Sequence, residues 1–530
     1  MSAGAAGRNE KDGRIVVIGG GLNGLTAAAM LARQGKRVTL VEARPSFGGL
    51  AAGMEFHPGY RAPGLLLDAS RVRPWVVESL GLQLARVARP ELVLASGEGG
   101  PEEIRVREGV ADGLAGAVTA ADREGYAGLV AFAQKVRPVV TRIMDRAPLS
   151  VRDSLWSLLK TGWAVRRLGG EAMTELMRVA PMAVADWMRD RLETERLRAG
   201  LAIGALEGAF TGPWSAHTAV HGLLREALAG DEVVGGPAAL ATALEAAARA
   251  AGVELRSGTR VTRIVCGGRE ADGGVTGVEV RGGDGVGGDW GDGVGEVIPT
   301  RTVLSTLDPK KTFAALIGPP AVPLALGDAA RFYRMRGATG VVWLALSGPL
   351  ETRAGTTVAA LRTGDTLDEV ERAWDAAKYR AMAERPVLDV RVPSVADPSL
   401  APPGGAGGAV VQVHAHAAAF DIAGGWTDEA RALFGARVVE ALGRVCPTAP
   451  ARIVGLRVWS PADIAAEFGV SQGHLWHGEH APDQLVSFRP AIAAGRYATS
   501  IPGLYLGGGS THPGGGAHLG NGALAALAMK

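Results

Sequence analysis

The sequence predicts an α/β protein in which a second, mixed α+β domain interrupts a domain built on a parallel sheet. Three observations predict this fold. Residues 14–42 have the pattern of a strand, a glycine-rich turn, a helix and a second strand. From about 74 to 228, apolar residues recur mostly at helical spacing, for example over 173–193. Strand patterns return from 253 onward, for example over 339–346. A short apolar strand near the C-terminus then leads into a second glycine-rich turn, within 503–516.

The first unit has the pattern of a Rossmann-type dinucleotide-binding fold. Its strands are 14–18 and 38–42, and helix 22–34 lies between them. In such a turn the first glycine permits the tight bend, the second lets the backbone approach a pyrophosphate, and the third lets the helix pack closely on the sheet. The pyrophosphate would lie at the helix N-terminus, where free N–H groups favour negative charge. The candidate contacts in this turn are Gly19, Gly21, Leu22, Asn23 and Gly24.

Glu42 ends the second strand, where an acid accepts hydrogen bonds from a ribose and disfavours a 2′-phosphate. A glycine pair, Gly48 and Gly49, follows closely and would let the backbone pass beside a bulky ligand. A nicotinamide site does not usually require this freedom at that place. We therefore predict FAD as the cofactor, with Ala43 and Arg44 among its contacts.

The acid and the glycine pair resemble the opening motif of the FAD-dependent amine oxidase superfamily. Segment 503–516 is similar to the closing flavin motif of the phytoene desaturase-like branch. That branch contains carotenoid desaturases, ketolases and isomerases, and retinol saturases. Segment 477–490 resembles the sub-branch named after a pyridine nucleotide-disulfide oxidoreductase domain. The resemblance covers nearly the whole chain and includes 211–213 and 393–404.

The resemblance implies a Rossmann-type FAD-binding domain, in a glutathione reductase-like flavoprotein with the two-dinucleotide-binding fold, interrupted by a mixed α+β substrate domain. The FAD-binding domain would comprise 13–75, 231–310 and 452–530, and the substrate domain 76–230 and 311–451. Residues 1–12 are predicted to be a disordered leader. Further cofactor contacts are implied at Val261, Gly508, Gly509, Gly516, Gly520 and Asn521.

Two histidines near the C-terminus are candidate catalytic residues. His512 lies in the glycine-rich turn and matches a position of the family, whereas His518 stands where the family more often has Pro or Met. Either imidazole would hydrogen-bond the flavin or carry a proton near neutral pH. A structural histidine with satisfied hydrogen bonds is the alternative for both.

The other histidines favour structural or pocket-lining roles. His474, His477 and His480 are spaced by three, which leaves a metal site as an alternative. Gly478 argues against the regular helix that would align them, so no metal is predicted. His414 and His416 alternate on a predicted strand and share one face, where they would line the core or a pocket.

The composition excludes several classes of partner. The chain has 530 residues and a formal net charge of +2, so no charge bias favours nucleic acid. Cys266 and Cys446 are the only cysteines and form no CxxC pair. A disulfide relay is therefore excluded, and a cytoplasmic location is favoured over secretion. Nothing in the sequence specifies an oligomeric state.

Membrane contact is considered for one segment. No apolar stretch reaches the roughly 20 residues of a transmembrane helix. The predicted helix 155–167 places Trp156 and Trp163 beside basic residues, as an interfacial helix does. Peripheral membrane contact is therefore an alternative to an internal amphipathic helix.

Three functional classes follow. The first is an FAD-dependent dehydrogenase, desaturase or ketolase that transfers a hydride from an apolar or polyene-like small molecule to flavin N5. The second is an oxidase of amines or amino acids, and the third is a flavin-binding isomerase or non-catalytic protein. We favour the first, because the resemblance points to oxidation at carbon. A second dinucleotide fingerprint, which NADPH-dependent hydroxylation would use, is absent from the sequence.

Overall fold

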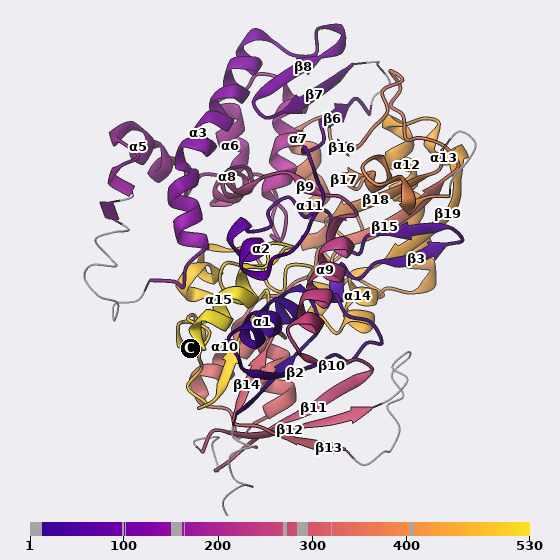
Figure 1. Ribbon diagram of the computed structural model, residues 1–530. Helices are drawn as coiled ribbons and strands as arrows, with labels where there is room; N and C mark the ends of the chain where they lie inside the picture. The colour runs from indigo at the N-terminus through magenta and orange to yellow at the C-terminus, as the bar shows by residue number, and fades with distance from the viewer. Residues whose placement is uncertain are drawn as a thin grey trace, which may run out of the picture.

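A computed structural model of the protein describes residues 13–97, 100, 102–149, 162–163, 165–268, 273–282, 295–319, 321–402 and 407–529. Within them the strands form a five-stranded, a three-stranded and an eight-stranded sheet and two short ribbons (Figure 1). The predicted leader 1–12 lies outside these residues, as does most of the predicted helix 155–167 and of the glycine-rich segment 282–295.

The five-stranded sheet is parallel throughout, and its order is β10-β2-β1-β14-β20. These strands are β1 (Arg14–Ile18), β2 (Arg37–Val41), β10 (Glu254–Arg256), β14 (Thr302–Ser305) and β20 (Leu504–Leu506). Segments far apart in the sequence therefore supply one sheet, which confirms the predicted α/β fold of Rossmann type. The central strand, β1, is an apolar run because other elements cover both faces of such a sheet.

Three helices pack beside this sheet: α1 (Leu22–Arg33), α9 (Gly236–Ala250) and α15 (Gly520–Ala528). The N-terminal turns of α1 and α15 meet closely, since a Cβ atom at Gly522 would collide with the carbonyl group of Asn23. Both helices therefore present their N-terminal ends to the same region. Free N–H groups and the helix dipole make that region favourable for negative charge.

An antiparallel three-stranded sheet extends this part of the protein. It consists of β11 (Thr259–Cys266), β12 (Val275–Gly282) and β13 (Glu296–Pro299). Two backbone hydrogen bonds fix its start beside β2, since the N–H of Thr259 donates to the Glu42 carbonyl (2.9 Å) and that of Gly258 to the Arg44 carbonyl (2.9 Å).

The eight-stranded sheet has the order β19-β15-β18-β17-β16-β6-β7-β8. Its strands are β6 (Leu92–Ala95), β7 (Glu103–Arg107), β8 (Val110–Gly113), β15 (Thr339–Leu346), β16 (Ala360–Arg362), β17 (Leu388–Arg391), β18 (Ala409–His416) and β19 (Ile453–Trp459). Strand β19 lies in segment 452–530, which is expected to belong to the FAD-binding domain, but it pairs with β15 in the large sheet. The rest of the two-domain division stays a prediction.

The remaining helices are distributed around the large sheet and the five-stranded sheet (Figure 1). They are α2 (Pro74–Leu80), α3 (Ala120–Met144), α5 (Gly170–Val179), α6 (Val184–Arg189), α7 (Glu195–Ala205), α8 (Thr218–Leu228), α10 (Leu324–Phe332), α11 (Leu367–Lys378), α12 (Asp428–Val445), α13 (Ala449–Arg452) and α14 (Pro461–Phe468). The sequence predicted one helix over 173–193, but α5 and α6 replace it. Pro181 lies between them, and a proline lacks the N–H that a helix interior needs.

The remaining elements are short. The ribbons pair β3 (Met54–His57) with β4 (Tyr60–Ala62) and β5 (Arg86–Val87) with β9 (Glu232–Val233). The short helical segments are η1 (Gly49–Ala51), η2 (Leu114–Gly116), η3 (Lys310–Ile317), η4 (Pro393–Val395), η5 (Pro398–Leu400), η6 (Ser471–Gly473), η7 (Pro482–Gln484), η8 (Val486–Phe488) and η9 (Ile492–Ala494).

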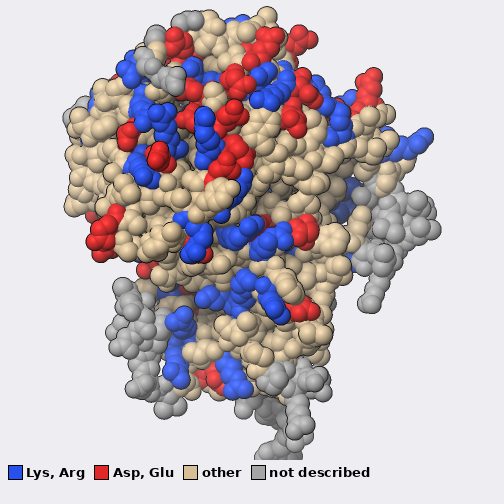
Figure 2. Space-filling view, turned by 180° about the vertical axis from the view of Figure 1, so that it is seen from behind, with Lys and Arg blue, Asp and Glu red and all other residues tan. Residues whose placement is uncertain are grey.

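The surface is mixed in charge. Figure 2 shows Lys and Arg interspersed with Asp and Glu on the upper part of one face, while basic side chains predominate lower on that face. Among the helices that the structure describes, none is both long enough and apolar enough to cross a bilayer.

Candidate functional site

A cleft opens at the carboxyl ends of the parallel strands, where α/β sheets bind their ligands. Gly19 follows β1, Glu42 follows β2, Thr306 follows β14, and Gly509 comes soon after β20. We call this space the cofactor cleft. The predicted contacts that line it are Gly19, Gly21, Leu22, Asn23, Glu42, Arg44, Gly48, Gly49, Gly509 and Gly516.

The glycines of the first turn have different surroundings. Gly19 has φ of +97°, and a Cβ atom there would lie 2.5 Å from Oγ1 of Thr306. A Cβ at Gly24 would collide with the Gly19 carbonyl oxygen, so this glycine permits close packing and does not line the cleft. At Gly21 the nearest atoms to such a Cβ are 4.0 Å away, in Gly48 and Gly49. A side chain at Gly21 would therefore enter the cleft and not the protein.

Glu42 lies at one end of the cofactor cleft beside Arg44 and Phe468. Its Oε2 accepts the Gly20 N–H (2.6 Å) and its Oε1 accepts the Arg44 N–H (2.8 Å). Burial raises the pKa of this carboxyl, and the backbone donors act in the opposite direction. The Arg44 guanidinium stacks over the Phe468 ring at 4.2 Å, which closes this end with a cationic and an aromatic surface.

The lining of the cofactor cleft also includes apolar side chains. Leu50, Leu66 and Leu475 line it together with His477 and Gly516. His477, for which the sequence favours a structural or pocket-lining role, lies in the cleft wall. Burial lowers the pKa of His477, although Asp308 acts to raise it. The imidazole is therefore neutral at physiological pH.

Several lining residues were missed. Thr306 and Leu307 follow β14 just as Gly19 follows β1, so a parallel-sheet assignment of β14 could have found them. Other predicted contacts lie outside the lining. Val261 packs in the core of the three-stranded sheet, and Gly508 packs against the Thr306 carbonyl. The predicted contacts outside the lining are Gly24, Ala43, Val261, Gly508, Gly520 and Asn521.

Neither His512 nor His518 lines the cofactor cleft. The Nε2 of His518 donates to the Gly514 carbonyl (2.9 Å), and its Nδ1 accepts the Gly520 N–H (3.0 Å). The Nε2 of His512 donates to the Ile143 carbonyl (3.0 Å), and its Nδ1 is buried without a partner. Burial lowers the pKa of His518 to about 3 and that of His512 to about 4. Both rings therefore have structural hydrogen bonds, and their catalytic roles stay predictions.

The buried, neutral state of His518 gives a testable contribution to stability. The pKa is lower in the folded than in the unfolded protein, so the contribution is present above about pH 6.5 and is lost as pH falls toward 3. Between about pH 6.5 and pH 5 a single such histidine removes about 2 kcal/mol. Urea unfolding at several pH values measures the free energy of unfolding. Between pH 6.5 and pH 5 this free energy should fall by that amount less in His518→Gln than in the unmodified protein. An equal fall in the two proteins would contradict the buried neutral ring.

The cofactor cleft fits an adenine dinucleotide. The Oδ1 atoms of Asn23 and Asn521, at the starts of α1 and α15, are buried without a hydrogen-bond partner. Buried polar atoms normally have hydrogen-bond partners. Because Asn23 lies in the cleft wall, a ligand with hydrogen-bond donors could satisfy its Oδ1 atom. The open space at Gly21 and the acid at Glu42 suit a pyrophosphate and a ribose.

A family model described as FAD dependent oxidoreductase matches residues 14–391. The chain belongs to this family. Its cofactor is FAD, and it is an FAD-dependent oxidoreductase.

Two relatives align over nearly the whole chain. Pyridine nucleotide-disulfide oxidoreductase domain-containing protein 2 of Rattus norvegicus is 26% identical and covers 97% of this chain and 93% of its own length. A limonene dehydrogenase subunit of Castellaniella defragrans is 25% identical over 94% of this chain and 91% of its own length. Among solved structures, putrescine oxidase bound to putrescine has a TM-score of 0.57 at 13% identity, covering 98% of both chains. That likeness is one of fold.

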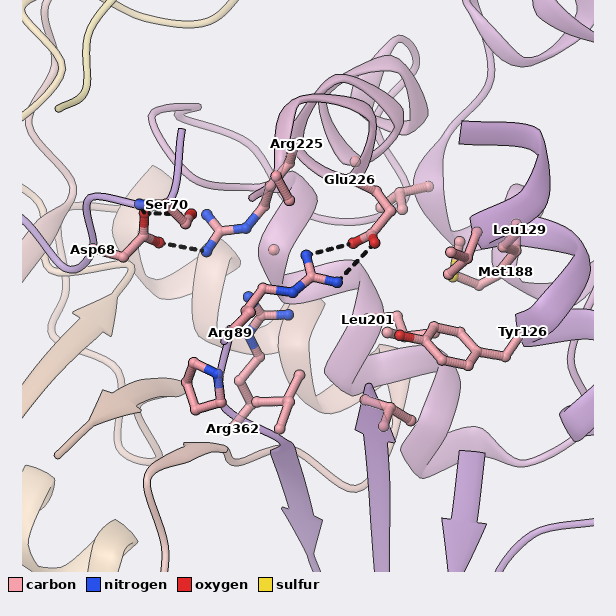
Figure 3. Close-up of a pocket in the computed structure, with 18 of the residues that line it drawn as sticks. Asp68, Ser70, Arg89, Tyr126, Leu129, Met188, Leu201, Arg225, Glu226 and Arg362 are labelled. Carbon is pink, nitrogen blue, oxygen red and sulfur yellow. Dashed lines mark hydrogen bonds and ion pairs between the residues drawn. The ribbon is translucent and has the colours of Figure 1, made fainter. Parts of the chain in front are cut away.

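Two further cavities lie near the cofactor cleft, although neither shares a lining residue with it. Gly516 lines the cleft, and Gly515 lines a connecting cavity whose wall includes Arg71, His221 and His518. An inner cavity shares Gly204 and Arg225 with the connecting cavity. Figure 3 shows the inner cavity with charged groups on one side and apolar groups on the other; its labelled apolar and aromatic residues are Tyr126, Leu129, Met188 and Leu201.

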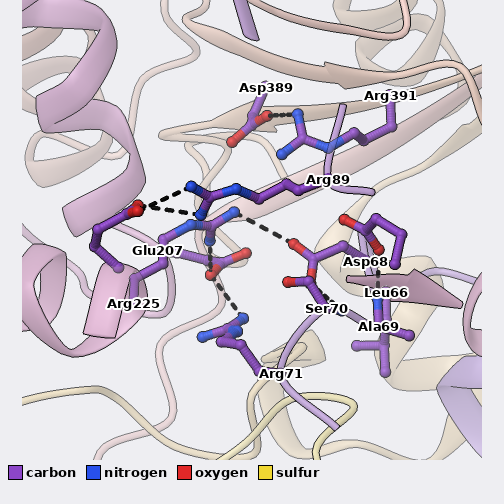
Figure 4. A network of polar contacts seen from close by, with 12 residues as sticks. Leu66, Asp68, Ala69, Ser70, Arg71, Arg89, Glu207, Arg225, Asp389 and Arg391 are labelled. Atoms are coloured by element: carbon purple, nitrogen blue, oxygen red, sulfur yellow. Dashed lines mark hydrogen bonds and ion pairs between the residues drawn. The ribbon is translucent and has the colours of Figure 1, made fainter. Parts of the chain in front are cut away.

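The charged side of these cavities is a charge network formed by Asp68, Arg71, Glu207 and Arg225 (Figure 4). Arg225 contacts both Glu207 and Asp68, the latter at 3.3 Å, and Arg71 contacts Glu207 at 3.1 Å. Burial alone would raise the pKa of Asp68, but the neighbouring guanidiniums hold it well below its usual value. The same guanidiniums lower the pKa of Glu207. Both carboxylates are thus ionised and depend on Arg225.

The two cysteines of the chain lie away from the cofactor cleft. Cys266 and Cys446 are free thiols, neither lines the cofactor cleft, and burial raises the pKa of both. Across the part of the chain that the structure describes, no group of three or more His, Cys, Asp or Glu residues could hold a metal ion.

Proposed function

We propose that this FAD-dependent oxidoreductase is a dehydrogenase of the desaturase or ketolase type, which acts on a small molecule with a large apolar part. The observation that carries the proposal is the inner cavity, which has a large apolar side. It shares Gly204 and Arg225 with the connecting cavity, whose Gly515 is next in sequence to Gly516 of the cofactor cleft. Leu129, Val130, Trp187, Met188 and Leu201 form its apolar side. The full-length likeness to the limonene dehydrogenase subunit, whose name indicates a terpene substrate, supports the same class.

Bound FAD supplies a hydride acceptor for a carbon–hydrogen bond. The chain itself holds the cofactor and prepares the surroundings. The N-terminal ends of α1 and α15 favour negative charge, and Glu42 offers its carboxylate to ribose hydroxyls. The apolar walls exclude water from the substrate, which strengthens electrostatic interactions nearby.

When a double bond forms, the neighbouring carbon also releases a proton. When an alcohol becomes a keto group, the hydroxyl oxygen releases it. We propose His477 as the proton acceptor, because it lines the cofactor cleft and is neutral. His512 and His518 have structural hydrogen bonds, which makes them less suitable for this role. The phytoene desaturase-like branch, suggested by segment 503–516, remains part of this proposal.

The test is anaerobic reduction of the holoprotein. We expect limonene or a linear polyene alcohol to bleach the visible absorbance of the flavin, and mass spectrometry to find a product that has lost two hydrogens. His477→Gln should slow bleaching by about 10²–10⁴-fold while leaving flavin content near normal. Bleaching by amines alone, with hydrogen peroxide released in air, would favour the amine oxidase class. Turnover without any flavin reduction would favour an isomerase.

A further inference from the structure

A third cavity opens at the surface, between the β5–β9 ribbon and η4. We call it the outer cavity, and it has a volume of about 380 Å³. Its walls are mostly apolar and include Leu67, Val87, Val233, Val392, Pro393 and Val395. Two of these, Val87 and Val395, are 39% and 52% exposed, so apolar side chains stand at its opening. A concave apolar space of this size is typical of a small-molecule site.

Charged residues form the inner wall of the outer cavity. Asp68, Arg89, Glu232 and Arg391 line both this cavity and the inner cavity. Three of the four are already paired within the protein. Arg89 binds Glu226 at 2.8 Å. Asp68 contacts Arg225 at 3.3 Å, and Arg391 contacts Asp389 at 3.1 Å. The Arg89–Glu226 pair is visible in Figure 3.

Glu232 differs from these residues. Among the residues that the structure describes, no cation lies within 4.0 Å of its carboxylate, and its one hydrogen bond is from the Ala69 N–H at 3.3 Å. The groups that face it at longer range are Asp68, Arg391 and Arg225. Burial and the Asp68 charge raise the pKa of Glu232 to about 7. A desolvated carboxylate that lacks a counter-ion is unfavourable unless a ligand supplies one.

We propose that the outer cavity binds an amphipathic cation, with its apolar body against Leu67, Val233 and Val392 and its ammonium group beside Glu232. An ammonium supplies the charge and the donors that this carboxylate lacks, and an alkyl chain fits the apolar walls. An anion would meet the carboxylates of Asp68, Glu91 and Glu232. Of the arginines in the lining, Arg89 and Arg391 are already paired with Glu226 and Asp389, and Arg107 is exposed. The outer cavity shares no lining residue with the cofactor cleft, but it shares Glu232 with the inner cavity, so this is a second ligand site that adjoins the proposed substrate site.

The experiment titrates the FAD-loaded protein with octylamine, octanol and octanoate by calorimetry. The three probes have the same alkyl chain and differ in the charge of the head group. Octylamine is expected to bind most tightly and octanoate most weakly. Between about pH 6 and pH 8 the ionised fraction of Glu232 rises from about one tenth to about nine tenths, so octylamine affinity should rise about tenfold. Octanol affinity should not change.

Two variants and a matched control decide the role of Glu232. Glu232→Gln should abolish the pH dependence and reduce octylamine binding to the level of octanol. Glu91→Gln removes an exposed carboxylate that lines the same cavity. It should leave the octylamine affinity and its pH dependence unchanged. Val395→Arg adds a cation at the exposed opening, so it should weaken octylamine binding but not octanol binding, and it provides the answer if Glu232→Gln fails to fold.

Three results would overturn the proposal. The first is equal affinity for octylamine and octanol at both pH values. The second is unchanged octylamine binding in Glu232→Gln or in Val395→Arg. The third is anaerobic bleaching of the flavin by octylamine, because the probe would then have reached the cofactor cleft. Retained yellow colour and an unchanged melting temperature identify variants that are correctly folded. Failure of the limonene experiment would leave this binding result unaffected.

Discussion

Gly21→Val is expected to give a folded protein that contains no FAD. A Cβ atom at Gly21 has no neighbour nearer than 4.0 Å, so the valine side chain finds room only in the cofactor cleft. That room is where the backbone of a dinucleotide-binding turn approaches the pyrophosphate. Purified protein should therefore be colourless, with the circular dichroism spectrum of the unmodified apoprotein. Added FAD should produce no change in flavin fluorescence.

Gly24→Val is the matched control, because it places the same side chain one turn further along the same motif. Here the Cβ would collide with the backbone carbonyl of Gly19, which cannot move aside without breaking the turn. This variant should fail to fold or unfold at much lower temperature, whether or not FAD is present. A yellow Gly21→Val protein would contradict the assignment of the turn to the pyrophosphate.

The sequence predicted the parts of the fold that local patterns determine. The first strand, turn and helix follow from apolar periodicity and glycine spacing, and they appear as β1 and α1 nearly as expected. β15 has the predicted limits because an eight-residue apolar run, 339–346, is buried on both faces. The predicted helix 173–193 was wrong, since the apolar spacing continued across Pro181 while the backbone could not.

Contacts between distant segments were harder to predict. Thr306 and Leu307 reach the cofactor cleft only because β14 inserts next to β1, a pairing that no local pattern encodes. β19 lies in the segment 452–530 that the family resemblance implies for the FAD-binding domain, but its partner β15 comes from the other predicted domain. The sequence also provided no indication that His518 has backbone partners at both ring nitrogens.

The charge network was the hardest of these long-range contacts to predict from the sequence. Asp68 and Arg225 lie 157 positions apart, and each stands in a segment whose pattern looks ordinary. Burial makes their pairing necessary, because an isolated charge in such a place is costly. We favoured an apolar substrate from the sequence, and the structure adds a charged wall to the apolar one. A substrate of the proposed reaction would therefore meet both surfaces.

Arg225→Leu is expected to destabilise the protein by about 3–5 kcal/mol at neutral pH. Arg225 is buried between Glu207 and Asp68, and leucine leaves these two carboxylates without that charge (Figure 4). Both carboxylates have a lowered pKa in the folded protein, so their stabilisation is present above the unfolded value near 4 and is lost as pH falls. The difference between variant and unmodified protein should thus stay nearly constant from about pH 7 to about pH 5 and shrink as pH falls below about 4.

Urea unfolding of the two proteins over that pH range measures the effect. Arg249→Leu is the control, because Arg249 makes a similar pair with Glu245 on the exposed side of α9. Its side chain is 60% exposed, and removal of such a pair should change the free energy of unfolding by less than about 1 kcal/mol. Equal unfolding midpoints for Arg225→Leu and Arg249→Leu would show that water already reaches the network. The two buried carboxylates would then not depend on Arg225, and the charged wall would be open to solvent.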